Sequence, residues 1–215
     1  MEASSVWGRS RCTLVANDVE NSLVELAMLT MSLGVAPHHQ KHYLSENIFD
    51  APEELTRWYG KVDYILANPP FSLRIENEQF ESPLFLSGYR NSDALFLDTA
   101  LKLLRPEGRL VCLLPHSVIA NSDFSKLRTI VEESWAVVGV ICLPEGVFQL
   151  SAGTTTRADI VVLDKLNGSR MRAHKKVFAS TPSVGIRLNN IARDTVENDL
   201  ERLVQDAEVR VALGL

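Results

Sequence analysis

The chain has 215 residues, of which 46% are hydrophobic and 23% are charged, and its formal net charge is −5. These values predict an ordinary soluble globular protein with one substantial core, or one domain with an appendage. No apolar run is long enough to span a membrane and no signal peptide is visible, so we expect a cytoplasmic protein with no membrane partner. The charge argues against an extended basic surface for nucleic acid, but a local basic strip or a partner could supply phosphate contacts.

The cysteine and histidine residues do not predict a metal site. Cys12, Cys112 and Cys142 each lie in an apolar, strand-like run, and their spacing fits neither a zinc site nor a disulfide framework. We therefore expect buried, reduced thiols. Three histidines lie between residues 38 and 42, but no acidic or cysteine ligand stands at a matching spacing. A solvated loop explains these histidines better than a metal does.

The first predicted unit is a strand, an acidic residue and a helix. The apolar run Cys12–Ala16 ends at Asn17-Asp18, and apolar residues then recur at helical spacing until Gly34, a typical C-terminal cap. In nucleotide-binding α/β folds, an acidic residue at such a strand end commonly hydrogen-bonds a ribose hydroxyl. Asp18 fits that role, but Asp is also a frequent residue at helix N-caps, so both interpretations stay open.

Two short elements and a longer strand follow. We expect a short strand and turn over Tyr43–Asp50, and a short helix from Asp50 to about Tyr59 with Pro52 near its start. The apolar run Val62–Ala67 then predicts a buried strand. It stops abruptly at the turn Asn68-Pro69-Pro70-Phe71.

This turn is the most informative stretch of the sequence. It leaves the carboxyl end of a predicted strand, where open α/β sheets bind their ligands. Its two prolines fix φ and remove two backbone donors, which leaves free carbonyls, the Asn68 amide and the Phe71 ring. The exocyclic amine of adenine or cytosine is a poor nucleophile, because its lone pair is delocalised into the ring. The Asn68 oxygen and a proline-locked carbonyl could accept hydrogen bonds from such an amine, while Phe71 stacks on a flipped base.

The alternative interpretation is an ordinary Asn-Pro turn beside a core phenylalanine. The position of the turn directly after a hydrophobic strand favours function.

Strands and helices alternate through the rest of the chain. Residues 72–91 have no sustained period and predict a functional lid or a loop that contacts substrate. Helices are predicted from Asn91-Ser92-Asp93 to Pro106 and again after Ser122. We predict buried strands at residues 109–114, 137–143 and 158–163. The last two strands are joined without a helix, so the fold class is α/β with a mostly parallel, doubly wound sheet and an antiparallel last strand.

The C-terminal part is less specific. Residues 165–178 hold five Lys or Arg residues and no acidic one, which fits either a phosphate-contacting strip or a solvated hairpin edge. A helix with an apolar stripe follows, and we expect it to pack on the same domain rather than on a partner. The stripe consists of Val196, Leu200, Leu203, Val204, Ala207 and Val211. We predict a main domain over residues 1–180 and a helical appendage over residues 181–215.

In order and spacing, these segments resemble the catalytic domain of the N6-adenine DNA methyltransferases of type I restriction-modification systems, the modification subunits. The resemblance covers most of that domain after its first strand, and it implies a Rossmann-like methyltransferase fold. The similar segments are Asp18-Val19-Glu20 with Leu26-Ala27-Met28, the motif Ala67–Ser72, Leu101–Pro115, Leu143–Phe148, and Gly153-Thr154 with the closing strand to Asp164-Lys165.

The resemblance implies a role for each residue of the turn. Asn68 and Pro69 would accept hydrogen bonds from the target amine, Pro70 would be a rigid spacer, and Phe71 would be the stacking platform. The reaction would be in-line methyl transfer from a sulfonium to adenine N6 in DNA, driven by alignment and by polarisation of the amine.

The resemblance also implies S-adenosylmethionine as the cofactor. Asp18 would contact its ribose hydroxyls, and Asn47 stands where an acidic or amide residue usually contacts its adenine amine. The family begins this site with a strand and a glycine-rich turn before the Asp18 strand, but Met1–Arg11 has Gly8 alone. We therefore expect the first strand-helix unit to be missing, although it would form the central strand beside the Asn68 strand. Two apolar strand edges would then lie unpaired.

Three hypotheses follow from the sequence. The first is methyl transfer to DNA, with a specificity subunit or a complementary methylase chain as partner. The second is a truncated, non-catalytic DNA-binding or assembly module that needs a partner chain for cofactor binding. The third is an amine methyltransferase that acts on protein or RNA through the same turn.

Overall fold

The fold is that of a computed structural model, which describes residues 11–76, 80, 82–148, 155–167, 176–184 and 198–213. Contacts divide the chain into two compact units, residues 1–58 and residues 59–215. In the part of the chain that is described, every helix is too short or too polar to cross a membrane.

The first unit is a strand-helix-strand unit with two short helical turns after it. Strands β1 (Thr13–Asn17) and β2 (Gln40–Leu44) are parallel, and helix α2 (Asn21–Gly34) connects them. A 3-10 turn, η1 (Ile48–Asp50), and helix α3 (Glu53–Thr56) complete the unit. The predicted strand, helix and short helix are therefore confirmed.

Helix α2 buries little of its apolar surface. Val24 is buried, but several leucines of the same helix are between half and four-fifths exposed: Leu23, Leu26, Leu29 and Leu33. A helix normally turns its apolar stripe to a core. The described residues of this unit therefore leave part of that stripe without a packing partner.

The predicted solvated histidine loop is confirmed for His38, which is exposed in a turn, and is wrong for His39 and His42. His42 lies within β2, and His39 is buried. The Nδ1 atom of His39 accepts a hydrogen bond from the backbone amide of Cys12 at 3.0 Å. His39 thus ties the start of β1 to the start of β2, a long-range contact that no local pattern indicates.

The second unit is built on a five-stranded mixed sheet with the order β3-β4-β6-β5-β7. Its strands are β3 (Val62–Ala67), β4 (Leu104–Pro115), β5 (Trp135–Cys142), β6 (Ala158–Lys165) and β7 (Val177–Ser180). Strand β6 is antiparallel to both β4 and β5, whereas the β3–β4 and β5–β7 pairs are parallel. The predicted α/β class and the predicted antiparallel strand are confirmed, and β7 is an additional strand.

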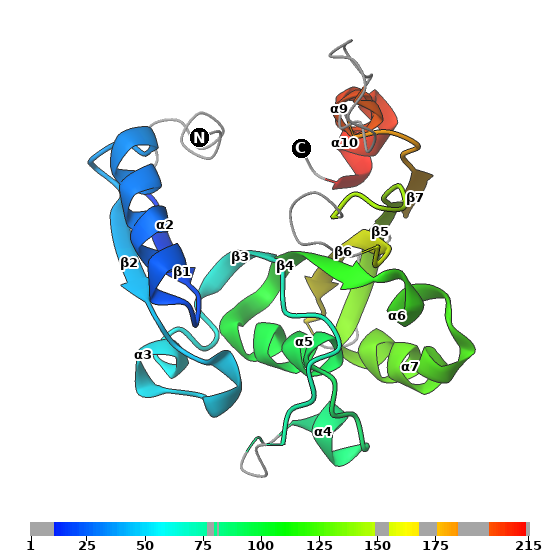
Figure 1. Cartoon of the computed structure of the whole chain (residues 1–215), viewed down its shortest axis with the longest axis horizontal. Helices are drawn as coiled ribbons and strands as arrows, with labels where there is room; N and C mark the ends of the chain where they lie inside the picture. Colours follow the sequence, from blue (N-terminus) through cyan, green and yellow to red (C-terminus); the bar gives the residue numbers. More distant parts are fainter. Residues whose placement is uncertain are drawn as a thin grey trace. The chain divides into compact units, whose positions relative to one another are not determined.

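Helices cover the middle of this sheet. Figure 1 shows α5 (Ser92–Leu103), α6 (His116–Ala120) and α7 (Ser125–Ser134) on one side of strands β4, β6 and β5, with the C-terminal helices on the other side. A 3-10 turn, η2 (Ser122–Phe124), leads into α7, and α4 (Pro83–Leu86) precedes α5. Almost the whole of α5 is buried, because continuous apolar strands require cover on both faces.

The C-terminal segment packs on the sheet as two short helices, α9 (Asp199–Gln205) and α10 (Ala207–Leu213). The predicted single helix is wrong, because the chain is extended at Asp206 and the Asp206 carboxylate accepts the amides that open α10. The predicted stripe changes with it: Val211 is exposed, and Val196 lies outside the described residues. Local packing is confirmed, since Val209, Ala212 and Leu213 join a core cluster with Val138, Val162 and Val177.

Strand β3 is an edge strand, and its predicted burial is wrong. Among the described residues it pairs with β4 alone, and the side chains of Tyr64 and Leu66 are 56% and 80% exposed. An apolar strand that lacks a neighbour on one edge cannot bury its outer residues. Strand β1 likewise pairs, within the described part of the chain, with β2 alone.

The predicted end of the long helix near Pro106 is also wrong. Helix α5 ends at Leu103 and strand β4 begins at Leu104, so Pro106 and Gly108 lie in the strand. The β3–β4 register jumps between Val62 and Tyr64, and Glu107 takes a φ of 63°. Gly108 is required there, since an added Cβ would come within about 3 Å of two backbone carbonyl oxygens.

As predicted, Cys12, Cys112 and Cys142 form no disulfide. Only Cys112 is fully buried, and burial raises its pKa to about 12. The predicted burial is wrong for Cys12 and Cys142, which are partly exposed because each lies near the end of its apolar run. Three of the five basic residues predicted near the C-terminus (Arg170, Arg172 and Lys175) lie outside the described residues, as does Gly153-Thr154.

Candidate active site

The turn Asn68–Phe71 leaves the carboxyl end of β3, as the sequence predicts. Asn68 is exposed and makes no hydrogen bond with another described residue, so its side-chain amide is available to a ligand. Pro69 is buried, Pro70 is exposed and Phe71 is half-buried. The arrangement combines a fixed backbone with an accessible acceptor and part of an aromatic face.

The start of helix α5 holds this turn in place. The Ser92 side chain is fully buried, and its hydroxyl donates a hydrogen bond to the Pro70 carbonyl. The same hydroxyl accepts a hydrogen bond from the Leu73 amide at 3.2 Å, and the Ser92 amide donates to the Leu73 carbonyl at 2.8 Å. Three hydrogen bonds therefore connect one residue of α5 to the exit of the turn.

Asp93 adds a buried carboxylate next to the same turn. It is 1% exposed, and its Oδ1 atom has no hydrogen-bond partner among the described residues. Burial raises the pKa of this carboxyl, although the neighbouring backbone amides of Asp93, Ser72 and Ala94 act to lower it. The backbone at Ser72 is left-handed, with a φ of 56°, so the Asp93 contact holds a conformation that a serine seldom adopts.

Sequence patterns predicted Ser92 and Asp93 only as helix caps. The N-cap position is Asn91, whose side chain makes no capping hydrogen bond. The positioning role of Ser92 and Asp93 depends on contacts across about 20 residues of chain. A Ser-Asp pair at the start of the next helix is the signal that points to it.

The segment after the turn is anchored, although it was predicted to be irregular throughout. Ser82 caps the short helix α4 by accepting from the Phe85 amide, and the Leu84 amide donates to Asp98 of α5 at 2.9 Å. The guanidinium of Arg90 lies 3.6 Å from the centre of the Phe85 ring. A contact with substrate stays a prediction for this segment.

Asp18 lies directly after the carboxyl end of β1, and its carboxylate is only partly engaged. Its Oδ1 atom accepts a hydrogen bond from the Glu20 amide at 2.9 Å, and no bond from a described residue reaches Oδ2. The N-cap of α2 is Glu20, so Asp18 is not the capping residue that one interpretation required.

Asn47 follows the carboxyl end of β2, the parallel neighbour of β1. Its side chain is already engaged: Oδ1 accepts from the Phe49 amide at 3.1 Å, and Nδ2 donates to Asp50 at 2.9 Å. Asn47 therefore caps the 3-10 turn η1. A ligand that binds Asn47 would have to exchange one of these bonds, most simply the side-chain bond to Asp50.

A pair of reciprocal hydrogen bonds, missed at the sequence level, fixes these two strand ends. The Asn17 amide nitrogen donates to the Glu46 carbonyl at 3.0 Å, and the Glu46 amide donates to the Asn17 oxygen at 3.1 Å. The loops that carry Asp18 and Asn47 are therefore held at the same end of the first unit. That end is the carboxyl edge of parallel strands, where α/β folds bind nucleotides.

Three comparisons with known proteins bear on this arrangement. The model of the family N-6 DNA Methylase matches residues 7–207. Over 103 residues, the chain is 25% identical to the Defense against restriction protein B of Escherichia phage P1, which corresponds to 48% of this chain and 4% of that protein.

Solved structures show the same fold at low identity. The type I restriction enzyme EcoKI M protein superposes with a TM-score of 0.59 at 16% identity, over 91% of this chain and 40% of that protein. A putative class I S-adenosylmethionine-dependent methyltransferase from Listeria monocytogenes gives a TM-score of 0.58 at 17% identity, over 84% of this chain and 62% of that one. A modification subunit of a putative type I restriction enzyme from Vibrio vulnificus gives a TM-score of 0.57 at 14% identity, over 82% of this chain and 36% of that protein.

The chain thus spans less than two thirds of the length of each of these relatives. The fold that they share is the Rossmann-like fold expected from the sequence. Because the family model extends over almost the whole chain, from β1 to the start of the last helix, this protein belongs to the N-6 DNA Methylase family.

Proposed function

We propose that this chain supplies the catalytic turn, and part of the cofactor site, of an S-adenosylmethionine-dependent methyltransferase that modifies adenine N6 in DNA within a restriction-modification system. The observation that carries the proposal is the accessible Asn68 side chain on a proline-fixed turn at the carboxyl end of β3, in a member of the N-6 DNA Methylase family.

The turn has the groups that a weakly nucleophilic amine requires. The Asn68 oxygen and the Pro69 carbonyl accept the two N–H groups of the target amine, which draws its lone pair towards the methyl donor. Pro69 and Pro70 offer no competing backbone donor. Phe71 provides a face on which a base taken out of the duplex stacks. Ser92 and Asp93 keep these groups in register from the side of α5.

The residues of the first unit fit one end of the cofactor. Asp18 Oδ2 has no bond from a described residue, so it can accept bonds from ribose hydroxyls, and Asn47 stands on the adjacent loop. When bound, S-adenosylmethionine supplies the electrophilic methyl group. We propose that a segment outside the described residues holds the methionine end.

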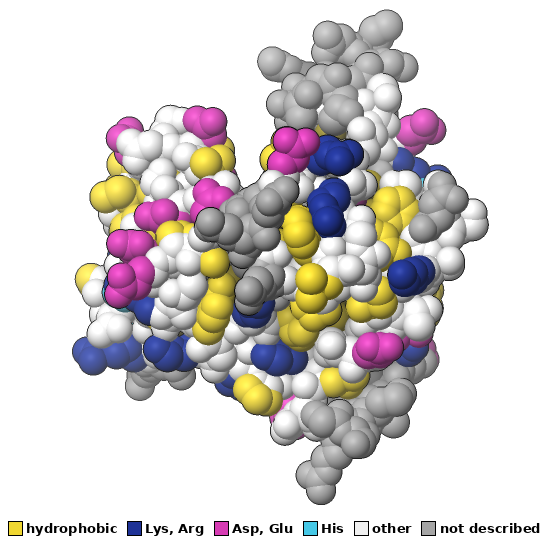
Figure 2. Space-filling model, turned by 90° about the horizontal axis from the view of Figure 1, so that it is seen from below, with side chains coloured by type: hydrophobic (Ala, Val, Ile, Leu, Met, Phe, Trp, Pro, Cys, Tyr) yellow, Lys and Arg dark blue, Asp and Glu magenta, His cyan; other side chains and the backbone are white. Residues whose placement is uncertain are grey.

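We propose that a parallel strand adds to the free edge of β3 in the active protein, and that a complementary methylase chain is one source of it. The exposure of Tyr64 and Leu66 and the unpacked leucines of α2 support this proposal, because such apolar surface is normally covered. A partner is also the expected source of DNA specificity and of phosphate contacts. On the face seen in Figure 2, the Lys and Arg side chains are scattered among acidic and hydrophobic ones and do not form one basic patch.

The test measures transfer of a labelled methyl group from S-adenosylmethionine to adenine-containing DNA. One arm uses the chain alone. A second arm uses a fusion in which a strand and a glycine-rich turn, of the kind that the family resemblance implies, precede the chain. Cofactor binding is followed separately as a cofactor-dependent rise in melting temperature.

We expect transfer by the fusion, and its loss on Asn68→Ala with the rise in melting temperature unchanged. Asp18→Ala should instead remove the rise in melting temperature. Transfer that survives Asn68→Ala would refute the assignment of the turn. The absence of both transfer and a cofactor-dependent rise in melting temperature with the chain alone would favour the truncated, non-catalytic module that needs a partner chain for cofactor binding.

A further inference from the structure

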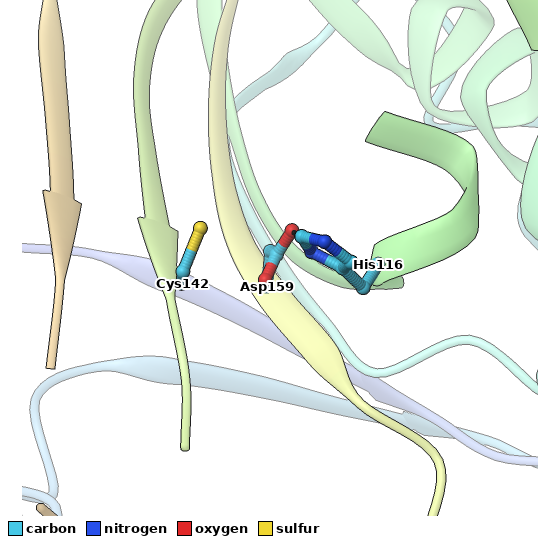
Figure 3. Close-up of side chains that lie close together, drawn as sticks. All are labelled: His116, Cys142 and Asp159. Atoms are coloured by element: carbon cyan, nitrogen blue, oxygen red, sulfur yellow. Dashed lines mark hydrogen bonds and ion pairs between the residues drawn. The ribbon is translucent and has the colours of Figure 1, made fainter. Parts of the chain in front are cut away.

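A cluster of three ligand-type side chains lies at the carboxyl edge of the second sheet, outside the residues used above. Cys142 ends β5, Asp159 opens β6, and His116 begins α6 directly after β4 (Figure 3). The strand register brings them together: Asp159 lies opposite Cys142 on one side and opposite Leu114 of β4 on the other. Directly opposed residues on neighbouring strands project from the same face of a sheet.

The geometry is compact. The Nδ1 atom of His116 lies 2.8 Å from the Oδ2 atom of Asp159, and one ligand atom from each of the three residues lies within 4.8 Å of the other two. The backbone of His116 is also fixed, because its amide donates to the Arg157 carbonyl at 2.9 Å. The Asp159 side chain is fully buried, whereas that of His116 is 32% exposed, so the cluster is closed on the sheet side and open beside His116.

Asp159 is not fully satisfied by protein groups. Its Oδ1 atom is buried, and no described residue donates a hydrogen bond to it with ordinary geometry. A buried carboxylate oxygen without a partner is costly, so such an atom requires an explanation. The Cys142 thiol is a neighbour of this carboxylate and makes a side-chain contact with it.

We propose that His116, Cys142 and Asp159 bind a divalent transition metal of the zinc class. An imidazole nitrogen, a thiolate and a carboxylate form a donor set that suits Zn²⁺, whereas Mg²⁺ and Ca²⁺ prefer oxygen ligands alone. The metal would bind the orphaned Asp159 oxygen, and its charge would favour the thiolate of Cys142. The thiol proton is released to solvent on binding, so metal binding should acidify a weakly buffered solution.

Three protein ligands leave one tetrahedral position open, and the exposed side of His116 is where water would occupy it. Site formation would join the ends of β4, β5 and β6. Cys112 of β4 pairs with Ala67, which precedes the catalytic turn, and His116 is four residues further along the same strand direction. The metal would therefore stiffen the edge of the sheet that carries Asn68. This inference does not depend on methyl transfer.

The experiment uses the whole chain after removal of metal with a chelator. Zn²⁺ is titrated by calorimetry, and Co²⁺ is added in parallel because a cobalt-thiolate bond gives a charge-transfer absorption band. We expect about one ion per chain, proton release, a charge-transfer band and a higher melting temperature.

Cys142→Ser should remove the charge-transfer band and weaken Zn²⁺ binding by at least about tenfold. Asp159→Asn should weaken binding similarly. The matched control is Cys12→Ser, which removes another partly exposed thiol, from the first unit, and should change neither the band nor the affinity. Absence of stoichiometric Zn²⁺ binding by the folded chain would overturn the proposal, as would binding that Cys142→Ser leaves unchanged or that Cys12→Ser weakens equally.

Discussion

The ion pair between Arg109 of β4 and Asp164 of β6 is expected to be a main determinant of the stability of the second unit. The pair is bidentate, with Nε–Oδ1 at 2.6 Å and Nη2–Oδ2 at 2.9 Å, and its side chains are only 18% and 16% exposed. Arg109 also donates to the Leu213 carbonyl at the end of α10. Arg109→Ala would leave a largely buried carboxylate without its guanidinium and release that carbonyl.

The magnitude follows from these contacts. Loss of one partner from a fully buried pair costs about 3–5 kcal/mol, and the partial exposure here lowers that to about 2–3 kcal/mol. The carbonyl bond adds about 1 kcal/mol. We therefore expect the free energy of unfolding to fall by about 3 kcal/mol, measured by urea denaturation with circular dichroism. With an ordinary denaturant dependence, the midpoint falls by about 1 M or more.

The same strand offers a matched control. Arg105 pairs with Asp63 at 2.6 Å, but those side chains are 45% and 60% exposed. An exposed pair of this kind contributes less than about 1 kcal/mol, because water competes for both groups. If Arg105→Ala costs as much as Arg109→Ala, burial is not what gives the Arg109 pair its strength, and the argument fails.

Three further predictions concern the interior of the same unit. Ser92→Ala should speed hydrogen exchange of the Leu73 amide and lower the unfolding free energy by about 1–2 kcal/mol, since two hydroxyl bonds are lost; unchanged exchange would contradict the anchoring role. Burial raises the pKa of Asp98 above its unfolded value, so the native state binds the extra proton and stability should fall as pH rises from about 4 through that raised pKa. Asp98→Asn should flatten this dependence in urea midpoints measured from pH 4 to 7. Leu127→Ala, at a 1% exposed position, should lower the free energy of unfolding by about 2–5 kcal/mol in the same assay. A smaller loss would show that neighbouring side chains move in to fill the space that the substitution leaves.

Much of the fold could be predicted because its strands are continuous apolar runs. Strands β3 to β6 lie where the runs at 62–67, 109–114, 137–143 and 158–163 predict them, and the absence of a helix before β6 gave its direction. Periodicity could not predict where α5 gives way to β4. Leu101 to Arg105 are all good helix formers, so the pattern carries the helix on to Pro106, whereas the register shift that starts the strand earlier depends on pairing with Val62.

The candidate site also has a part that local sequence predicts and a part that depends on contacts between distant segments. The turn Asn68–Phe71 and the position of Asp18 follow from local sequence, because proline geometry and strand ends are local properties. The hydrogen bonds that hold the turn do not follow from local sequence, because Ser92 contacts Pro70 only when β3 and α5 are both formed. The cluster of His116, Cys142 and Asp159 is less visible still, since strand pairing alone brings those residues together.

Within the described ranges, the turn Asn68–Phe71 is held by helix α5 and not by a strand beside β3. All the described bonds that hold it come from α5, on the β4 side of β3, and none comes from the free edge of β3. The acceptor geometry at Asn68 can therefore form without a strand on that edge. For the methyl donor, the contacts proposed among the described residues are Asp18 and Asn47, and both belong to the first unit. An added strand should accordingly raise cofactor affinity far more than it changes the turn, and hydrogen exchange at Leu73 should be nearly equal with and without it.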